Sequence, residues 1–226
     1  LRAVLPDRLH QPGPGSWPGL PPAEHVVARP RLEDHLTAGS AGPVTVLAAP
    51  AGWGKSVLAA SWAAAARAGG RSSAWVRLGA EHDHVAGLWR ALAEALSAVV
   101  GPAAGAELER LTAGAVDTDD LPGAFAAAVE LADRPVVLVL DDLHEVTSPG
   151  VHDGLVQLVE RAPPKLSLLV LTRRDPPWPL TRLRLAGVVV EVGVADLAFG
   201  PDEAAEMLAR LGLDLDVEQV ALLVER

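Results

Sequence analysis

At 226 residues, the chain is long enough for one sizeable core and part of a second unit. Half of its residues are hydrophobic, which is typical of a folded globular protein and excludes an intrinsically disordered chain. A formal net charge of −10 argues against a basic nucleic-acid-binding surface, so any contact with DNA would have to come from elsewhere in the polypeptide. The sequence contains no cysteine, which excludes disulfides and thiolate metal sites.

The ends of the chain and its hydrophobic segments favour a cytoplasmic fragment of a longer polypeptide that has no membrane partner. No apolar stretch approaches the length that spans a bilayer, and the N-terminus lacks the pattern of a signal sequence. The chain begins at Leu1, without methionine, and stops at Arg226 within a helical pattern. Residues 1–23 contain many prolines and glycines and are expected to form an extended lead-in.

The first regular elements flank a glycine-containing loop. Residues 44–48 form a short apolar run typical of a buried strand, and residues 55–68 are rich in helix formers and end at a pair of glycines. The sequence APAGWGKS between them has the form A-x-x-x-x-G-K-S, in which backbone N–H groups close on phosphate oxygens and the lysine reaches the β and γ phosphates. We therefore predict a phosphate-binding loop, or P-loop, that binds ATP or ADP. Its expected nucleotide ligands are Pro50, Ala51, Gly52, Trp53, Gly54, Lys55, Ser56 and Val57.

Two residues of this loop depart from its usual form. Ala49 stands where the motif often begins with glycine, which is tolerable if the backbone there keeps a negative φ. Trp53 is unusually bulky, and the sequence does not decide whether it stacks on a neighbouring element or on a partner. The alternative to a P-loop is a glycine-rich turn that ends a strand and leaves the Lys55 side chain in solvent.

The elements that follow alternate between strands and helices. Residues 73–78 resemble a second strand, Asp83 is expected to cap a helix with apolar residues on one face, and another helix is expected over residues 120–132. A further helix is expected to begin at Ser148-Pro149. An uninterrupted aliphatic run predicts a strand at residues 136–140, residues 166–171 are expected to form another buried strand, and residues 188–192 are expected to form a fifth. Such alternation indicates a parallel α/β sheet flanked by helices, as in P-loop NTPases.

Beyond Phe199 the pattern changes to helices alone. Pro201 begins a helix with one apolar stripe, and Asp216 with Gln219 three residues later resembles a capping pair for a second helix. Two consecutive helices without a strand suggest the start of a helical lid subdomain. We therefore divide the chain into the lead-in at residues 1–23, a P-loop nucleotide-binding α/β domain at residues 24–199 and the start of the lid at residues 200–226.

Polar residues near the strand ends are candidates for binding Mg²⁺ and for activating the water that attacks the nucleotide. Ser56 follows the P-loop lysine and can place its hydroxyl on Mg²⁺, while Asp141, at the end of a buried strand, can hold the water shell of the metal. Asp142 projects differently and is a candidate general base that orients the attacking water. The alternative for this acidic pair is a solvated strand end or a cap for the next element.

Two arginines end the next apolar strand, at the carboxyl edge where α/β sheets bind ligands. One of them, with Arg173 favoured over Arg174, is expected to contact the γ-phosphate and report its loss. The alternative is a surface pair that satisfies Asp175 or a helix C-terminus. The predicted catalytic residues are thus Lys55, Asp142 and Arg173, and the predicted metal ligands are Ser56 and Asp141.

Three histidines lie near these motifs. His82 and His84 lack a third ligand in register and are interpreted as parts of a polar loop and not as a metal site. His144, just beyond the acidic pair, is expected to pack or to hydrogen-bond the loop, with a contact to substrate water or phosphate as the alternative.

Four blocks occur in one order: PAGWGKS, LVLDDLHEV, LTRRDPPWPLTRLRLAG and LAFGPDEAAEML. Together they resemble the nucleotide-binding module, of the NACHT/NB-ARC-like kind, of the large ATP-binding LuxR-type transcriptional regulators. These MalT-like proteins belong to the STAND class of signalling NTPases. The upstream VVARPRLEDHL resembles the segment of that class whose valine and arginine border the adenine site, which implies Val27 and Arg29 as cofactor-binding residues.

The resemblance implies an ATPase switch. Such a protein is ADP-bound and closed at rest, then binds ATP and self-associates once an inducer acts on a C-terminal sensor. A helix-turn-helix outside these residues then binds DNA. Hydrolysis is expected to be slow, because a switch benefits from a long-lived bound state. Two other functions stay open: an AAA-type ATPase or small-molecule kinase in which the chemistry is the output, and a scaffold that binds nucleotide without hydrolysing it.

Overall fold

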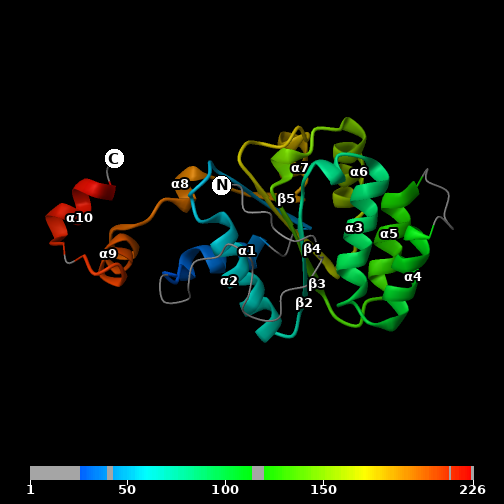
Figure 1. Ribbon diagram of the computed structural model, residues 1–226, viewed down its shortest axis with the longest axis horizontal. Helices are drawn as coiled ribbons and strands as arrows, with labels where there is room; N and C mark the ends of the chain where they lie inside the picture. The colour runs from blue at the N-terminus through cyan, green and yellow to red at the C-terminus, as the bar shows by residue number, and fades with distance from the viewer. Residues whose placement is uncertain (1–25, 40–42, 114–119, 214, 225–226) are drawn as a thin grey trace, which may run out of the picture.

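The computed structural model describes residues 26–39, 43–113, 120–213 and 215–224, and the predicted lead-in lies outside them. The core of the fold is a five-stranded parallel sheet with helices on both faces (Figure 1). Its strands are β1 (Val44–Ala48), β2 (Ser72–Arg77), β3 (Val136–Asp141), β4 (Leu166–Thr172) and β5 (Val189–Val192). Their order across the sheet is β2-β3-β4-β1-β5. The structure thus confirms the predicted parallel α/β fold.

Burial on both faces of the sheet explains the uninterrupted aliphatic runs. All six residues of β3 are buried, and the side chains of its five aliphatic residues alternate between two hydrophobic clusters. Val137 and Val139 join the cluster beneath one pair of helices, α1 (Pro30–Gly39) and α2 (Lys55–Ala68). Leu138 and Leu140 join the larger cluster on the opposite face. The helices that contribute to this cluster include α3 (Val85–Ser97), α4 (Pro102–Thr112), α5 (Leu121–Glu130) and α6 (Pro149–Glu160) (Figure 1).

Four helices have no counterpart in the predicted elements. These are α1, α4, α7 (Leu180–Leu185) and α8 (Val194–Leu197). The buried face of α4 consists of Ala104, Gly105 and Leu108, so its apolar periodicity is weak in the sequence. The α7 and α8 helices are only six and four residues long, which is too short for a helical period to emerge.

The capping role predicted for Asp83 is wrong. The helix α3 begins after His84, whose Nδ1 accepts a hydrogen bond from the N–H of Gly87 at 2.9 Å. The Asp83 carboxylate instead accepts hydrogen bonds from the N–H groups of Thr147 and Ser148, at 2.7 and 2.6 Å, and from the Thr147 hydroxyl. Three bonds from the neighbouring loop replace a single capping bond, and they tie the start of α3 to the start of α6.

Two further helices, α9 (Pro201–Arg210) and α10 (Val217–Val224), follow the sheet and extend away from it at one end of the molecule (Figure 1). The predicted capping pair is present, because Gln219 N–H donates to Asp216 Oδ1 at 2.9 Å and Asp216 N–H donates to Gln219 Oε1 at 3.0 Å. The two consecutive helices predicted from the sequence therefore form. Across the described residues, no helix has the length and apolar character needed to cross a membrane.

Candidate nucleotide-binding site

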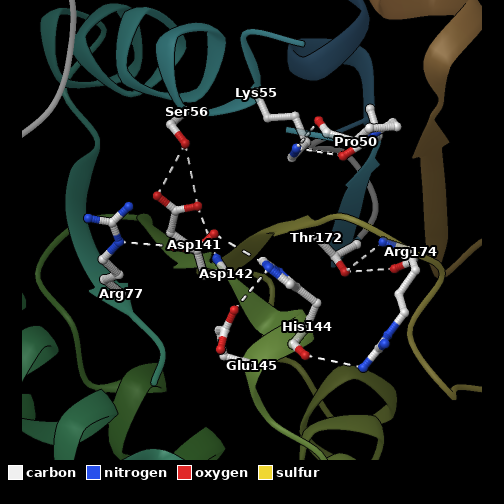
Figure 2. Close-up of polar contacts among 11 residues, drawn as sticks. Pro50, Lys55, Ser56, Arg77, Asp141, Asp142, His144, Glu145, Thr172 and Arg174 are labelled. Carbon is white, nitrogen blue, oxygen red and sulfur yellow. Dashed lines mark hydrogen bonds and ion pairs between the residues drawn. The ribbon is translucent and has the colours of Figure 1, made fainter. Parts of the chain in front are cut away.

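The sheet order brings three predicted site segments together. β4 lies between β1 and β3, and the three strands run parallel, so their carboxyl ends meet at one edge. The P-loop follows β1, Asp141 ends β3 and Arg173 follows β4. Segments far apart in the sequence therefore share the edge at which open α/β sheets bind ligands (Figure 2).

The P-loop combines unsatisfied donors with open space. The backbone N–H groups of residues 52–57 donate to no acceptor in the described part of the chain. Gly52 and Gly54 have φ angles of 86° and 72°, and a Cβ added at either position would meet no atom within 4 Å. The loop leads into the N-terminus of α2, whose partial positive charge adds to these donors. The donor set and the space beside it fit the phosphates of a nucleotide.

Ala49 is compatible with this loop. Asp142 is the single non-glycine residue with a positive φ among the described residues, so Ala49 meets the condition that its substitution for glycine requires. The N–H of Ala49 donates to Thr172 O at 3.2 Å, which extends the pairing of β1 with β4 by one residue.

The Lys55 side chain bends back over the P-loop. Its Nζ donates to Ala49 O at 2.6 Å and to Pro50 O at 2.9 Å (Figure 2). Burial lowers the pKa of Lys55, the nearby Asp141 carboxylate opposes this shift, and the positive charge of Arg173 adds to it. Lys55 is thus held by the loop itself, which argues against a plain turn with a solvated lysine.

Ser56 and Asp141 meet from α2 and β3. The Ser56 hydroxyl oxygen lies 3.3 and 3.4 Å from the two carboxylate oxygens of Asp141 (Figure 2). Burial raises the pKa of Asp141, which is 5% exposed, and the adjacent Asp142 carboxylate raises it further. A hydroxyl and a carboxylate are hard oxygen donors that suit Mg²⁺, whose remaining ligands in such sites are waters and phosphate oxygens. This donor set fits the metal expected with a nucleotide.

Asp142 has an unusual backbone conformation. Its φ of 59° lies in the left-handed region, which is costly for a residue other than glycine and is found at functional sites. Its N–H donates to Asp141 Oδ1 at 3.0 Å, and its carboxylate pairs with Arg77 Nε at 3.0 Å. Arg77 ends β2 directly beside Asp141 in the strand register. The sequence gives no local signal for Arg77, because its place beside the acidic pair follows only from the strand order.

The two arginines after β4 differ in their surroundings. Arg174 Nη2 donates to His144 O at 3.3 Å, and its backbone carbonyl accepts the Thr172 hydroxyl at 2.6 Å (Figure 2). Arg173 is exposed and lies close enough to Lys55 and His144 to lower the pKa of each. Arg173 thus adds positive charge near Lys55 and His144, whereas Arg174 supports the loop that follows β3.

His144 lies between these charged groups with its side chain 10% exposed. Neither ring nitrogen makes a hydrogen bond within the described residues, although Nε2 lies 3.2 Å from Glu145 Oε1 and Nδ1 lies 4.0 Å from Asp142 Oδ1. Burial lowers the pKa of His144, and Arg173 acts in the same direction. The ring thus packs within the site, and the backbone carbonyl of His144 accepts the hydrogen bond from Arg174 of the neighbouring loop.

An apolar cavity of about 340 Å³ begins beside the P-loop. The P-loop residues Gly52, Trp53 and Gly54 line it, as do Val27 and Arg29, the two residues that the resemblance places beside adenine. The rest of its apolar wall comprises Val26, Val57, Leu58, Leu197, Ala198, Phe199 and Met207. Cavities of this size and character commonly bind small molecules. Four of the predicted ligands, Pro50, Ala51, Lys55 and Ser56, do not line the cavity. Of these, Pro50 and Ala51 lie exposed at the loop.

Arg29 shapes the wall of this cavity through contacts within the protein. It donates from Nη1 to Leu197 O and from Nη2 to Ala198 O, both at 2.9 Å, and binds the Glu203 carboxylate at 2.9 and 3.2 Å. Its guanidinium also lies 4.7 Å from the centre of the Phe199 ring. Four of its five N–H groups are thereby used. Arg29 therefore fixes the segment that leads into α9 more than it offers donors to a ligand.

Comparison with known proteins establishes the family. The profile of the AAA ATPase domain matches residues 29–171, which is more than half of the chain. The chain belongs to the AAA ATPase domain family.

A relative in sequence and a similar solved structure indicate which kind of AAA ATPase domain this is. It is 31% identical over 188 residues to the HTH-type transcriptional regulator MalT of Klebsiella pneumoniae, a match that covers 81% of this chain and 20% of the relative. The chain thus spans about a fifth of the length of that protein. A STAND protein with a tetratricopeptide repeat sensor from Pyrococcus horikoshii superposes with a TM-score of 0.65 at 21% identity, over 94% of this chain and 30% of the other. The predicted MalT-like STAND nucleotide-binding module is confirmed.

Proposed function

We propose that this AAA ATPase domain binds ATP and ADP with Mg²⁺ and hydrolyses ATP slowly, as the switch of a longer transcriptional regulator. One juxtaposition carries the proposal: the unsatisfied N–H groups of residues 52–57 belong to the same loop whose Gly52, Trp53 and Gly54 line the apolar cavity. An adenine nucleotide needs these two environments side by side, because its phosphates require donors and its base requires an apolar enclosure.

Each predicted residue has a task in this proposal. Lys55 and the loop N–H groups bind the phosphates, and Arg173 contacts the γ-phosphate. Ser56 and Asp141 would hold Mg²⁺, and the bound metal would supply Lewis-acid stabilisation of negative charge on the phosphoryl oxygens. Asp142 orients the attacking water and accepts its proton. Arg77 binds Oδ2 of the Asp142 carboxylate, which leaves Oδ1 to accept a hydrogen bond from the attacking water.

The output of the switch lies outside these residues. We propose that the ATP-bound state promotes self-association of the full-length protein and controls DNA binding through a C-terminal helix-turn-helix. The MalT relative is an HTH-type transcriptional regulator, which supports this output. Within the chain, Arg29 links the cavity wall to Glu203 on α9, so a change at the cavity has a direct route to the last two helices.

Calorimetric titration of ATP-Mg and ADP into the parent and into Lys55→Ala tests the proposal. The variant should lose at least about 2 kcal/mol of binding free energy, the scale of a charge-assisted hydrogen bond. Lys165→Ala is the matched control, because Lys165 binds the carbonyls of Glu130 and Ala132 at the opposite edge of the sheet. Unchanged affinity of Lys55→Ala for ATP-Mg would contradict the P-loop assignment.

Mass analysis of the nucleotide released from denatured parent protein is a second, independent measurement. ADP or ATP retained through purification would support a switch with a long-lived bound state. A different retained ligand would count against an adenine nucleotide.

A further inference from the structure

The cavity extends from the P-loop along one face of α2. Its lining includes Gly54, Val57 or Leu58, and Ser61, which follow one another at intervals of three or four residues and so share a face of the helix. With a rise of 1.5 Å per residue, Ser61 lies roughly 10 Å beyond the loop along the helix axis. A ribose and a base would extend in this direction from phosphates bound at the loop.

Two polar side chains meet at this far end. Ser61 on α2 donates a hydrogen bond from its hydroxyl to Oε1 of Glu33 on α1 at 2.6 Å, and both residues line the cavity. This bond uses the single hydroxyl proton of Ser61 and fixes the orientation of the carboxylate. Neither a hydrogen bond nor a salt bridge from the described residues reaches Oε2 of Glu33. The oriented carboxylate therefore retains acceptor capacity at the cavity.

The other side chains that line the cavity are less suited than Glu33 to accept a hydrogen bond from a ligand. Arg29 has four of its five N–H groups committed to the protein. The Trp53 indole N–H is a donor only, and the other lining side chains are apolar or glycine. In such an apolar setting a polar group of the ligand must find its partner or lose binding free energy. Glu33 is thus the lining side chain suited to accept a hydrogen bond from a ligand.

We propose that Glu33, oriented by Ser61, accepts a hydrogen bond from the exocyclic 6-amino group of adenine and thereby determines the base preference of the site. This inference rests on the proposed binding of adenine nucleotides. The 6-amino group donates hydrogen bonds, whereas the 6-oxygen of guanine or hypoxanthine would direct lone pairs at the carboxylate. Ser61 is the positioning residue, because it acts on the base through Glu33.

Paired titrations with ATP and purine riboside 5′-triphosphate test this inference, because the two ligands differ only in the 6-amino group. The parent should bind ATP about tenfold or more tightly than the analogue, the ratio expected for one hydrogen bond to a charged acceptor. Glu33→Leu should bind the two ligands within about twofold of each other. Ser61→Ala should reduce the ratio partly, and Glu33→Gln should retain part of it because its amide oxygen still accepts.

The analogue also reports whether each variant is intact. A folded Glu33→Leu protein should keep the parental affinity for purine riboside triphosphate, since that ligand never uses the carboxylate. Asp34→Asn is the charge-matched control, because Asp34 is exposed on the same helix and does not line the cavity. The ratio of the affinities of Asp34→Asn for ATP and for purine riboside triphosphate should equal that of the parent. Should Glu33→Leu fail to fold, the ratios of Glu33→Gln and Ser61→Ala decide the question.

The outcomes separate this inference from the proposed function. If the parent binds ATP but does not discriminate against the analogue, or if Glu33→Leu keeps the full parental ratio, Glu33 does not read the base. If the parent binds neither ligand, the proposed function itself fails and this inference fails with it.

Discussion

The buried carboxyl group of Asp141 affects the stability of the folded domain. Burial and the neighbouring Asp142 carboxylate both raise its pKa above the ordinary value. A carboxyl group with a raised pKa in the folded state stabilises the fold below the unfolded-state pKa, and this contribution is lost as the pH rises through the folded-state pKa. At neutral pH the ionised Asp141 therefore destabilises the domain, a cost that its proposed role as a metal ligand would explain.

Asp141→Asn should consequently raise the stability of the nucleotide-free domain while weakening the Mg²⁺ dependence of ATP binding. Removal of about 1 kcal/mol of unfavourable free energy corresponds to a rise of roughly 2–4 °C in melting temperature for a protein of this size. The gain should shrink as the pH is lowered toward the range where the parental carboxyl is protonated. Thermal melts at several pH values, with and without ATP-Mg, measure both effects, and a lower melting temperature at neutral pH would contradict the argument.

Asp142→Asn should retain ATP binding and lose hydrolysis, because an amide cannot accept the proton of the attacking water. Phosphate release under single-turnover conditions provides the measurement. Glu145→Gln is the control, since Glu145 is exposed on the same turn and should leave the rate unchanged. Hydrolysis by Asp142→Asn at the parental rate would show that the base is another group.

Arg173→Ala should narrow the gap between the affinities for ATP and ADP and leave ADP binding nearly intact. A ligand shifts an equilibrium only by its differential affinity for two states, so a γ-phosphate contact must affect ATP selectively. Paired titrations with ADP and a non-hydrolysable ATP analogue measure the gap. Arg174→Ala is the natural comparison, because Arg174 binds His144 O instead. An equal loss of both affinities would make Arg173 a general pocket residue.

Among the secondary-structure elements, α9 depends on a contact from the opposite end of the described chain. Glu203 in its first turn accepts the N–H of Gly200 at 2.9 Å and binds Arg29, with the two charged side chains 16% and 9% exposed. Burial alone would raise the pKa of Glu203, but the hydrogen bonds from Arg29 and Gly200 lower it overall. Because the pKa is depressed, this stabilisation is present at neutral pH and is lost as the pH falls below the usual range of glutamic acid.

Glu203→Gln should therefore loosen α9 and α10 while leaving the sheet intact. Loss of the charge on one partner of a largely buried pair costs about 1–3 kcal/mol, whereas a surface pair contributes less than about 1 kcal/mol. Glu206→Gln on the same helix breaks only the exposed pair with Arg210 and serves as the matched control. Hydrogen exchange should increase in residues 201–224 of Glu203→Gln alone. Equal exchange in both variants would mean that Arg29 does not hold the helix.

How far the sequence predicts this fold differs between elements. The bounds of β1 and α2 agree with residues 44–48 and 55–68, because an apolar run, a glycine-rich loop and a glycine pair mark them. The strand predicted at residues 73–78 is displaced by one position. By contrast, α4 is not predicted, because small residues provide most of its buried face.

Some residues of the candidate site are likewise predictable from the sequence and others are not. The residues of the P-loop and of the strand ends are recognisable from motifs, and the structure brings Ser56 and Asp141 into contact. Arg77, Glu33 and Glu203 are not recognisable, because each acquires its partner only through tertiary packing across many residues of sequence. A motif records local spacing, and these contacts depend on strand order and on the packing of helices.

The whole domain carries a net charge of −10, and this bears on where DNA is bound. We expect the domain alone not to bind duplex DNA at physiological salt, because its charge repels the phosphate backbone. A gel shift with labelled duplex over a range of salt concentrations measures this. Salt-sensitive retention of the duplex would contradict it and would locate a DNA contact within these residues.

The contact between Arg29 and Glu203 joins residues that are 174 positions apart in the sequence. The last strand, β5, likewise pairs with the first, β1. During synthesis at about 5–20 residues per second, the P-loop emerges on the order of ten seconds before α9 does. In that interval the phosphate-binding amides exist without a completed cavity wall, because the chain that supplies Leu197 and Phe199 has not been made. We therefore expect the newly made domain to bind nucleotide tightly only after α9 has been translated, because only then can both walls of the cavity form.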